Sequence, residues 1–384
     1  MNFLKLKTLF SSMKAMVLTA PKTTPQLQTL HMPKPKIGEA LIKIKACGVC
    51  HSDLHVIKEE LKFPTPCVLG HEVSGELVEI NDPRGKSNLK IGDRVVGTFI
   101  MPCTTCVNCG KGRDDLCTPF FEFNRVKGTL YDDTTRLFSY KDNSPIYMYS
   151  MGGLAEYCVT PIGGVYKLPD NVPLMESCII GCAIFTAFGT LKHGAQLVPG
   201  DSVAIIGAGG GVGLNCVQLA SKVFGASKII AIDVSDDKLS LAKSFGATDL
   251  INPKTEDPIK KLMAITNGQG VDVCVEALGR KATMEQAINL VKDGGKAVIT
   301  GLAPSWEKAE LELTRLVRRQ IRIIGAYGAR ARQDVPVIMS LLEKGVIDVT
   351  GGGISRVFSL EEAGMAYQLL SEGKINGRAI VKIS

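Results

Sequence analysis

The stretch SVAIIGAGGGVG, Ser202 to Gly213, decides the fold of this chain. A compact apolar run leads directly into a glycine-rich loop, and an amphipathic segment, Leu214 to Phe224, follows it. Strand, glycine loop and helix in this order let the backbone turn tightly and present free amide N–H groups at the positive end of a helix. Such a turn binds a phosphate anion without any basic side chain.

The glycine spacing of this loop is one residue longer than usual. Anchored on Gly207, a G-x-G-x-x-G pattern ends on Val212, whereas G-x-x-G-x-x-G fits from Gly207 to Gly213. A tight strand-to-helix turn alone would also explain these glycines. The residues expected to contact a dinucleotide are Gly207, Gly209, Gly210, Gly211, Val212 and Gly213.

An acidic residue follows at the distance that a dinucleotide site requires. The next strand ends at Asp233, twenty residues beyond Gly213. A carboxylate there accepts hydrogen bonds from the adenosine ribose hydroxyls and repels a 2′-phosphate. We therefore predict a site for NAD rather than NADP, although Asp233 could also serve as a cap before the helix SDDKL.

Strands and helices alternate around this loop. KIIAID, VDVCVEA and KAVITG are further apolar, β-branched runs, and the rhythm ends after IRIIGAYG, residues 321–328. This alternation predicts an α/β domain with a doubly wound parallel sheet. Upstream, alternating runs such as ALIKIKA, residues 40–46, and VVGTF, residues 95–99, are separated by turns and predict a β-rich antiparallel domain.

The expected organisation has four parts. The last sixty or so residues are too few for an α/β domain of their own, so we expect them to complete a neighbouring domain. The predicted parts are a basic leader, 1–13; a β-rich domain, 14–183; a parallel-sheet domain, 184–324; and a returning C-terminal segment, 325–384.

Composition excludes several classes of protein. The 384 residues are 45% hydrophobic and 22% charged, which is typical of an ordinary globular chain of two or three domains. The net charge of +7 is a mild excess that a solvated surface explains, so no nucleic-acid partner is expected. We also expect no membrane partner, because no run of eighteen uncharged apolar residues occurs.

The cysteines and the N-terminus bear on the compartment. Clustered C-x-x-C spacing in a long chain indicates metal ligands in a reducing, cytoplasmic setting rather than disulfides. The first 38 residues lack Asp and Glu, and MNFLKLKTLFSS has the lysines and serines of a mitochondrial transit peptide but no arginine. Cytoplasmic localisation is the expectation, and the mitochondrial matrix is the alternative if residues 1–12 act as a transit peptide.

Four of the twelve cysteines lie close together in a Gly-, Thr- and Asn-rich segment. Their spacing is C-x2-C-x2-C-x7-C, and four thiolates from one loop form a closed tetrahedral zinc site of structural type. An iron–sulfur cluster is the alternative, but the longer final gap and the lack of a second cysteine-rich run favour zinc. The predicted ligands are Cys103, Cys106, Cys109 and Cys117.

A second group of candidate ligands is scattered along the chain. Cys50 lies in ACGVCHSDLH, His71 and Glu72 in LGHE, and Cys182 in IIGCAIFTAFG. No spacing rule links such distant positions, and each residue alone would be a buried thiol or a core histidine.

The motifs GVCHSD, GHE, GDRVVG and GC, together with the cysteine segment, the glycine loop and Asp233, resemble one known family. From about Lys14 to the C-terminus the chain is similar to the zinc-dependent alcohol dehydrogenases of the medium-chain dehydrogenase/reductase superfamily. The resemblance implies a GroES-like β-rich catalytic domain, a Rossmann domain, two zinc ions per chain and NAD as cofactors. Its implied activity is reversible hydride transfer between a primary or secondary alcohol and NAD, giving an aldehyde or ketone.

The resemblance also implies roles at the second group. Cys50, His71 and Cys182 would hold a catalytic zinc, the Cys2His set known for alcohol dehydrogenase, whose charge cancels that of the metal and leaves a fourth position open. Asp53 would orient His71, and Glu72 would lie behind the metal.

A proton relay belongs to the same resemblance. It implies that the zinc-bound alcohol forms an alkoxide by losing its proton through Ser52, a cofactor ribose hydroxyl and His55. A plain surface histidine is the alternative for His55. Further implied contacts are with the cofactor, from His51, Lys238, Arg280 and Arg378, and with the substrate pocket, from Phe99.

Substrate and assembly are less determined. GTLYDDTTRL resembles the long-loop plant and animal members, which are dimers, so we expect a homodimer joined through the strand near residues 321–326. The partner is expected to be a small alcohol or aldehyde, and FFEF and IYMY hint at an apolar one. Two other classes stay open: a zinc-free quinone reductase on the same scaffold, and a catalytically silent zinc-stabilised binding protein.

Overall fold

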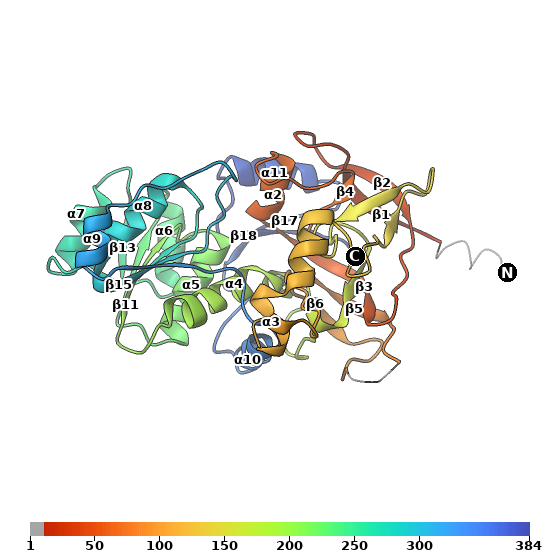
Figure 1. Cartoon of the computed structure of the whole chain (residues 1–384), viewed down its shortest axis with the longest axis horizontal. Coiled ribbons are helices and arrows are strands. Elements are labelled where there is room, and N and C mark those ends of the chain that lie inside the picture. Colours follow the sequence, from red (N-terminus) through yellow and green to blue (C-terminus); the bar gives the residue numbers. More distant parts are fainter. Residues whose placement is uncertain (1–10, 84, 86) are drawn as a thin grey trace. The chain divides into compact units, whose positions relative to one another are not determined.

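The computed structural model describes residues 11–83, 85 and 87–384, and it divides into two compact units (Figure 1). The first unit contains the described residues up to Cys182 together with Arg330–Glu343 and Arg356–Ser384. The second contains Ala183–Ala329 and Lys344–Ser355. The expected leader lies outside the described residues except for its last positions, and the first strand already begins at Ser12.

The C-terminal segment, predicted as 325–384, differs from the expectation in two places. Residues 325–329 and 344–355 belong to the second unit instead of completing the first. Two hydrogen bonds to the backbone of Asp348 link residues 344–355 to that unit: the Asp348 N–H donates to Oε1 of Gln218 at 2.7 Å, and its carbonyl accepts from Nε2 of Gln218 at 3.2 Å.

The first unit is β-rich, as predicted. A five-stranded sheet has the order β2-β1-β4-β8-β7, and a larger sheet has the order β10-β6-β5-β3-β18-β17 with β9 also paired to β3. The strands are β1 (Ser12–Leu18), β2 (Gln26–His31), β3 (Glu39–Val49), β4 (Cys67–Val68), β5 (Val73–Ile80), β6 (Arg94–Gly97), β7 (Leu137–Phe138), β8 (Pro145–Met148), β9 (Tyr157–Pro161), β10 (Val165–Lys167), β17 (Ile354–Phe358) and β18 (Arg378–Lys382).

Short helices connect these strands. They include the 3-10 helices η1 (Asp114–Leu116), η3 (Ile162–Gly164) and η4 (Glu176–Gly181) and a π-helix, η2 (Phe120–Arg125). The α-helices of this unit are α2 (His51–Ile57), α3 (Val107–Gly110), α10 (Ala331–Glu343) and α11 (Ala363–Ser371).

Strand β3 is the central, most extensively paired strand of the larger sheet. It pairs antiparallel with β5, β9 and β18, and every residue except Lys43 and Lys45 is buried. The pairing with β18 sets Ala379 opposite Val49. The start of β18, the last strand of the chain, therefore lies beside the residue that precedes Cys50.

The second unit is the predicted parallel sheet. Its strand order is β13-β12-β11-β14-β15-β16, and every pairing is parallel. The strands are β11 (Ser202–Ile206), β12 (Lys228–Ile232), β13 (Asp249–Ile251), β14 (Val271–Glu276), β15 (Val291–Ile299) and β16 (Arg322–Gly325). The helices are α4 (Ala183–Gly189), the π-helix η5 (Thr190–Ala195), α5 (Gly211–Lys222), α6 (Asp236–Ser244), α7 (Pro258–Ile265), α8 (Lys281–Leu290) and α9 (Leu313–Arg318).

The core of this unit is formed by its β-branched apolar strands. The β-branched runs bury both faces of the sheet, as parallel strands require, with Ile206, Ile230 and Ile232 at 2% exposure or less, and Leu290 of α8 packs in the same buried core. Helices α5, α6 and α8 pack on the strands that flank them (Figure 1). This confirms the predicted α/β class, a β-rich unit with a doubly wound parallel sheet.

One segment among the described residues is long and apolar enough to cross a membrane. It is Glu176–Ala195, and 89% of its apolar window is buried inside the structure. Such burial is typical of a core helix.

Candidate functional site

Four residues with metal-binding side chains converge in the first unit. Cys50 precedes α2, His71 and Glu72 precede β5, and Cys182 directly follows η4. The ligand atoms of these four residues all lie within 4.8 Å of one another, and all four side chains are buried. The structure thus brings together residues that are up to 132 positions apart (182 − 50), which no local spacing could predict. We call them the Cys50 group.

The charge of the Cys50 group favours a cation. The neighbouring Cys182, with Arg378 and His71, holds the pKa of the Cys50 thiol well below its ordinary value, although burial opposes this. Burial alone would lower the pKa of His71, but Asp53 and Cys50 raise it to about 10. Thiolate and carboxylate therefore surround the imidazole, a donor set that suits zinc.

Glu72 has a buried carboxylate that lacks hydrogen-bond partners within the described part of the chain. Neither of its carboxylate oxygens has a hydrogen-bond partner among the described residues, although Oε1 lies 2.8 Å from Nη2 of Arg378. Burial raises its pKa to about 7 against the opposing pull of Arg378. A buried carboxylate without hydrogen bonds is costly unless it is charge-compensated, so the residues present fit a metal ion at this place.

A glycine makes room for this carboxylate. A Cβ at Gly48 would lie 2.0 Å from Oε2 of Glu72, and the Gly48 N–H donates to the Glu72 carbonyl at 2.8 Å. The glycine of ACGVC is therefore required by the close approach of Glu72 to β3.

A second buried carboxylate holds His71 in place. Oδ1 of Asp53 accepts from the backbone N–H of Gly70 at 3.0 Å and lies 3.1 Å from Nδ1 of His71. This contact leaves Nε2 of His71 as the nitrogen for a metal, the arrangement seen at zinc-ligating histidines. Tyr367 donates its hydroxyl to Oδ2 of Asp53 at 3.0 Å, and burial and Asp53 keep its pKa well above the ordinary value.

The predicted relay residues lie on α2. Sγ of Cys50 is 3.7 Å from Oγ of Ser52, so Ser52 borders the Cys50 group. His55, one turn further along the helix, has its Nδ1 only 2.5 Å from Oε2 of Glu60. Sequence reasoning missed Glu60, whose only signal was an acidic residue five positions after a candidate histidine.

Aromatic rings line the His71 side of the group. The buried rings of Phe99 and Tyr149 lie 6.0 Å and 5.7 Å from the His71 ring, both edge-on. The guanidinium carbon of Arg125 lies 4.3 Å from the Tyr149 ring centroid. The substrate-pocket role of Phe99 stays a prediction.

Arg378 has a position that the sequence did not suggest. It is 4% exposed and paired with Glu72, beside the Cys50 group. Its expected cofactor contact stays a prediction, as does that of His51, the exposed first residue of α2.

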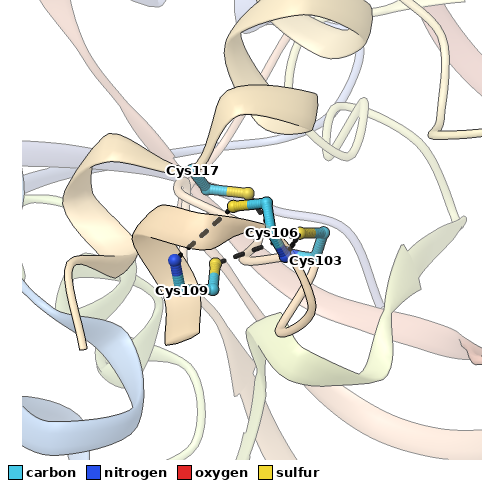
Figure 2. A group of neighbouring side chains, drawn as sticks. All are labelled: Cys103, Cys106, Cys109 and Cys117. Atoms are coloured by element: carbon cyan, nitrogen blue, oxygen red, sulfur yellow. Dashed lines mark hydrogen bonds between the residues drawn. The ribbon is translucent and has the colours of Figure 1, made fainter. Parts of the chain in front are cut away.

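The four clustered cysteines form a second convergent group (Figure 2). All their sulfur atoms lie within 4.8 Å of one another, and none of the twelve cysteines, all in the described part of the chain, forms a disulfide. Figure 2 shows the thiols pointing inward from the loop around α3. We call this segment, residues 103–117, the cysteine lobe.

Backbone amides solvate these sulfur atoms. Cys106 N–H donates to the sulfur of Cys103 at 3.3 Å, and Cys109 N–H to that of Cys106 at 3.5 Å. Burial raises the pKa of Cys106, but amides of Cys109 and Thr118 lower it to about 6. Such N–H···S contacts stabilise thiolates and are compatible with a closed zinc site.

Helix α10 anchors the cysteine lobe. Nε of Arg332 donates to both oxygens of the buried Asp114, at 3.0 and 3.1 Å, and the same guanidinium donates to the Cys109 carbonyl. The C-terminal segment thus fixes the lobe through a bidentate ion pair.

The glycine loop of the second unit has the predicted geometry. Strand β11 ends at Ile206, and α5 begins at Gly211 with Gly210 as its extended N-cap. A Cβ at Gly213 would lie 2.1 Å from the Gly207 carbonyl oxygen, so only glycine allows the helix to pack this closely on the loop.

Asp233 lies beside this loop. Its Oδ2 accepts from the Gly209 N–H at 3.1 Å, and the residue is 7% exposed. The strands that follow β11 in the chain are added first on one side of it, as β12 and β13, and then on the other side, as β14 to β16. Ligands of such parallel sheets bind at the carboxyl ends of the strands where this order reverses, here between β11 and β14. Lys238 lies near the loop, since a Cβ at Gly209 would contact its side chain at 2.2 Å, and Arg280 is exposed at the start of α8.

Comparison with known proteins gives consistent matches to both units. A family model described as alcohol dehydrogenase GroES-like domain matches residues 36–170, and one described as zinc-binding dehydrogenase matches residues 211–344. S-(hydroxymethyl)glutathione dehydrogenase of Escherichia coli O157:H7 is 34% identical over 366 residues, covering 94% of this chain and 97% of that protein.

Solved structures agree in fold. An alcohol dehydrogenase zinc-binding domain protein from Burkholderia ambifaria has a TM-score of 0.89 at 28% identity, covering 97% of this chain and 99% of that one. Benzyl alcohol dehydrogenase from Acinetobacter calcoaceticus has a TM-score of 0.88 at 28% identity with the same coverage of both chains.

Proposed function

This chain belongs to the zinc-dependent alcohol dehydrogenases of the medium-chain dehydrogenase/reductase superfamily, oxidoreductases with zinc and NAD as cofactors, and from that premise we propose that it transfers hydride between a primary alcohol and NAD. The observation that carries this proposal is the Cys50 group, whose ligand atoms lie within 4.8 Å of one another. A quinone reductase without zinc has no need of that convergence.

The residues of the Cys50 group and Asp53 have distinct proposed roles. Cys50, His71 and Cys182 would hold the catalytic zinc, and Glu72 would lie behind it. When bound, zinc lowers the pKa of a coordinated hydroxyl by several units, which makes proton loss feasible near neutral pH. Asp53 fixes the ring of His71 through the 3.1 Å contact to Nδ1.

Two residues of α2 would transfer the proton of the substrate hydroxyl. Ser52 borders the Cys50 group and would accept the proton of the substrate hydroxyl while passing its own hydroxyl proton on toward His55. His55 would exchange a proton with solvent, with Nδ1 held by Glu60 at 2.5 Å. Fixing one ring nitrogen leaves Nε2 to take up and release that proton.

The second unit supports NAD as the preferred dinucleotide. The loop around Gly207 to Gly213 would bind the pyrophosphate at the start of α5. Asp233 would accept hydrogen bonds from the ribose hydroxyls and repel a 2′-phosphate. Lys238, Arg280, Arg378 and His51 remain proposed cofactor contacts.

Two substrate classes have support. The aromatic rings of Phe99 and Tyr149 beside His71 favour a primary alcohol with an apolar or aromatic group. The similarity to the Escherichia coli enzyme makes S-(hydroxymethyl)glutathione the second candidate.

A panel of aliphatic, aromatic and glutathione-linked alcohols with NAD and NADP, followed at the nicotinamide absorbance, tests the proposal. NADH formation with at least one primary alcohol supports it. A protein that binds zinc but oxidises no member of the panel would instead be the silent binding protein.

We also propose a homodimer. Strand β16 is the edge of the parallel sheet, and its Ile323 is 38% exposed. An exposed edge strand can pair with a second copy. Light scattering should give a mass of two chains, and a tetramer would contradict this assembly.

A further inference from the structure

Asp53 accepts hydrogen bonds on both of its oxygens although it is fully buried. Oδ1 accepts from the Gly70 N–H and contacts Nδ1 of His71, and Oδ2 accepts from the hydroxyl of Tyr367 at 3.0 Å. Tyr367 comes from α11, 314 positions along the chain from Asp53. No feature of the sequence linked this tyrosine to the site.

The Tyr367 hydroxyl limits how the Asp53 carboxylate can turn. A carboxylate rotates readily about its last side-chain bond, and it fixes the imidazole only while one of its two oxygens points toward Nδ1 of His71. A donor on Oδ2 opposes that rotation. Since Tyr367 is 2% exposed, water is poorly placed to replace its hydroxyl.

We propose that Tyr367 is a positioning residue for the catalytic zinc, acting through Asp53 to hold His71 in its ligating orientation. The inference rests on the proposed function, because it assumes that His71 is a zinc ligand. It gives α11 a part in holding a site whose candidate metal ligands lie between Cys50 and Cys182, and not only a packing role.

A purely structural tyrosine would act through its ring. The aromatic ring fills space in the core between α11 and α2, and phenylalanine would fill the same space. The two roles therefore differ in the effect of removing the hydroxyl alone.

The test measures zinc release from the full-length holoenzyme to a chromogenic chelator. In Tyr367→Phe, zinc should leave the Cys50 group on the order of 10- to 100-fold faster than in the wild type, because loss of such supporting contacts weakens metal affinity to that extent. Release from the cysteine lobe should stay unchanged. Tyr166→Phe is the matched control, since the Tyr166 hydroxyl donates to the Gly163 carbonyl at 3.1 Å and has no contact with Asp53.

A double-mutant comparison shows whether Tyr367 acts through Asp53. In an Asp53→Ala background, adding Tyr367→Phe should change the release rate less than about twofold, because the contact is already lost. Cobalt substitution gives a spectroscopic readout: the visible bands of cobalt in the Cys50 group should shift in Tyr367→Phe and not in Tyr166→Phe. If Tyr367→Phe folds poorly, Tyr367→Met removes the same hydroxyl and serves instead.

The outcomes separate the two proposals. A wild-type protein with a single zinc per chain overturns the proposed function and this inference together. Two results would overturn only the role of Tyr367. One is a zinc ion in the Cys50 group that Tyr367→Phe releases at the wild-type rate. The other is that the increases in release rate caused by Tyr367→Phe and Asp53→Ala multiply in the double variant.

Discussion

Arg378 forms a buried ion pair with Glu72: Nη2 lies 2.8 Å from Oε1, and the two side chains are 5% and 0% exposed. Strand β18 carries this arginine to the end of β3, next to the residue before Cys50. The cation therefore compensates a carboxylate that lies among two thiols and an imidazole.

The first prediction concerns this pair. Arg378→Met should lower the free energy of unfolding by about 3–5 kcal/mol, because the buried Glu72 carboxylate loses the cation that compensates it and must either stay charged without a partner or take up a proton. Adding Glu72→Gln should recover part of the loss. Denaturant unfolding measures both, and an Arg378→Met variant that weakens NAD binding without any loss of stability would show that cofactor contact is its main role.

The relay gives the second prediction. Glu60→Gln should lower kcat for alcohol oxidation by roughly 3- to 10-fold, because the His55 ring loses the carboxylate that orients it. The KM for NAD should stay near the wild-type value. The nearby Glu59→Gln, which removes an exposed pair with Lys22, is the control. An unchanged kcat in Glu60→Gln would show that Glu60 has no part in the relay.

Cofactor choice is the third prediction. Asp233→Ser should raise the ratio of kcat/KM for NADP over NAD by at least about tenfold, because it removes the charge that repels a 2′-phosphate. NAD binding should also weaken, since the contact from Asp233 to the Gly209 N–H is lost. Asp237→Asn, in the exposed first turn of α6, should change neither. An unchanged ratio in Asp233→Ser would place cofactor selection elsewhere.

The fourth prediction is a pH dependence of zinc binding by the cysteine lobe. Burial raises the pKa of Cys117 to about 12 and that of Cys109 further still, so both thiols hold their protons in the metal-free protein near neutral pH. Zinc must displace these protons. Its apparent affinity should therefore rise with pH, by on the order of 100-fold per unit between pH 6.5 and 8.5.

Chelator competition at several pH values measures this slope, with the metal-free protein kept reduced. A flat affinity across that range would mean that the thiols are already ionised before zinc arrives.

Much of the fold was accessible from sequence because its signals are local. The run from Ser202 to Gly213 contains a whole strand, loop and helix start, and the glycines there report a steric need that the structure bears out at Gly213. The cysteine lobe is equally local, since α3 and its neighbouring turns lie within fifteen residues (117 − 103 + 1).

The Cys50 group was predicted only through the resemblance to a family. Its members come from three separate segments, and their contacts depend on how β3, β5 and η4 pack. The supporting residues were harder still. Tyr367, Arg378 and Arg332 reach the site and the lobe from the C-terminal segment, over more than 200 positions, and no periodicity or spacing records such a contact.

The measurement that tests the central claim most directly combines zinc content and turnover in Cys182→Ser. The wild type should contain two zinc ions per chain and reduce NAD with a primary alcohol. Cys182→Ser should retain one zinc ion, in the cysteine lobe, and lose turnover while still binding NAD. Cys158→Ser, at a buried cysteine of β9 outside both groups, should behave as wild type. A Cys182→Ser variant with two zinc ions and wild-type turnover would contradict the account.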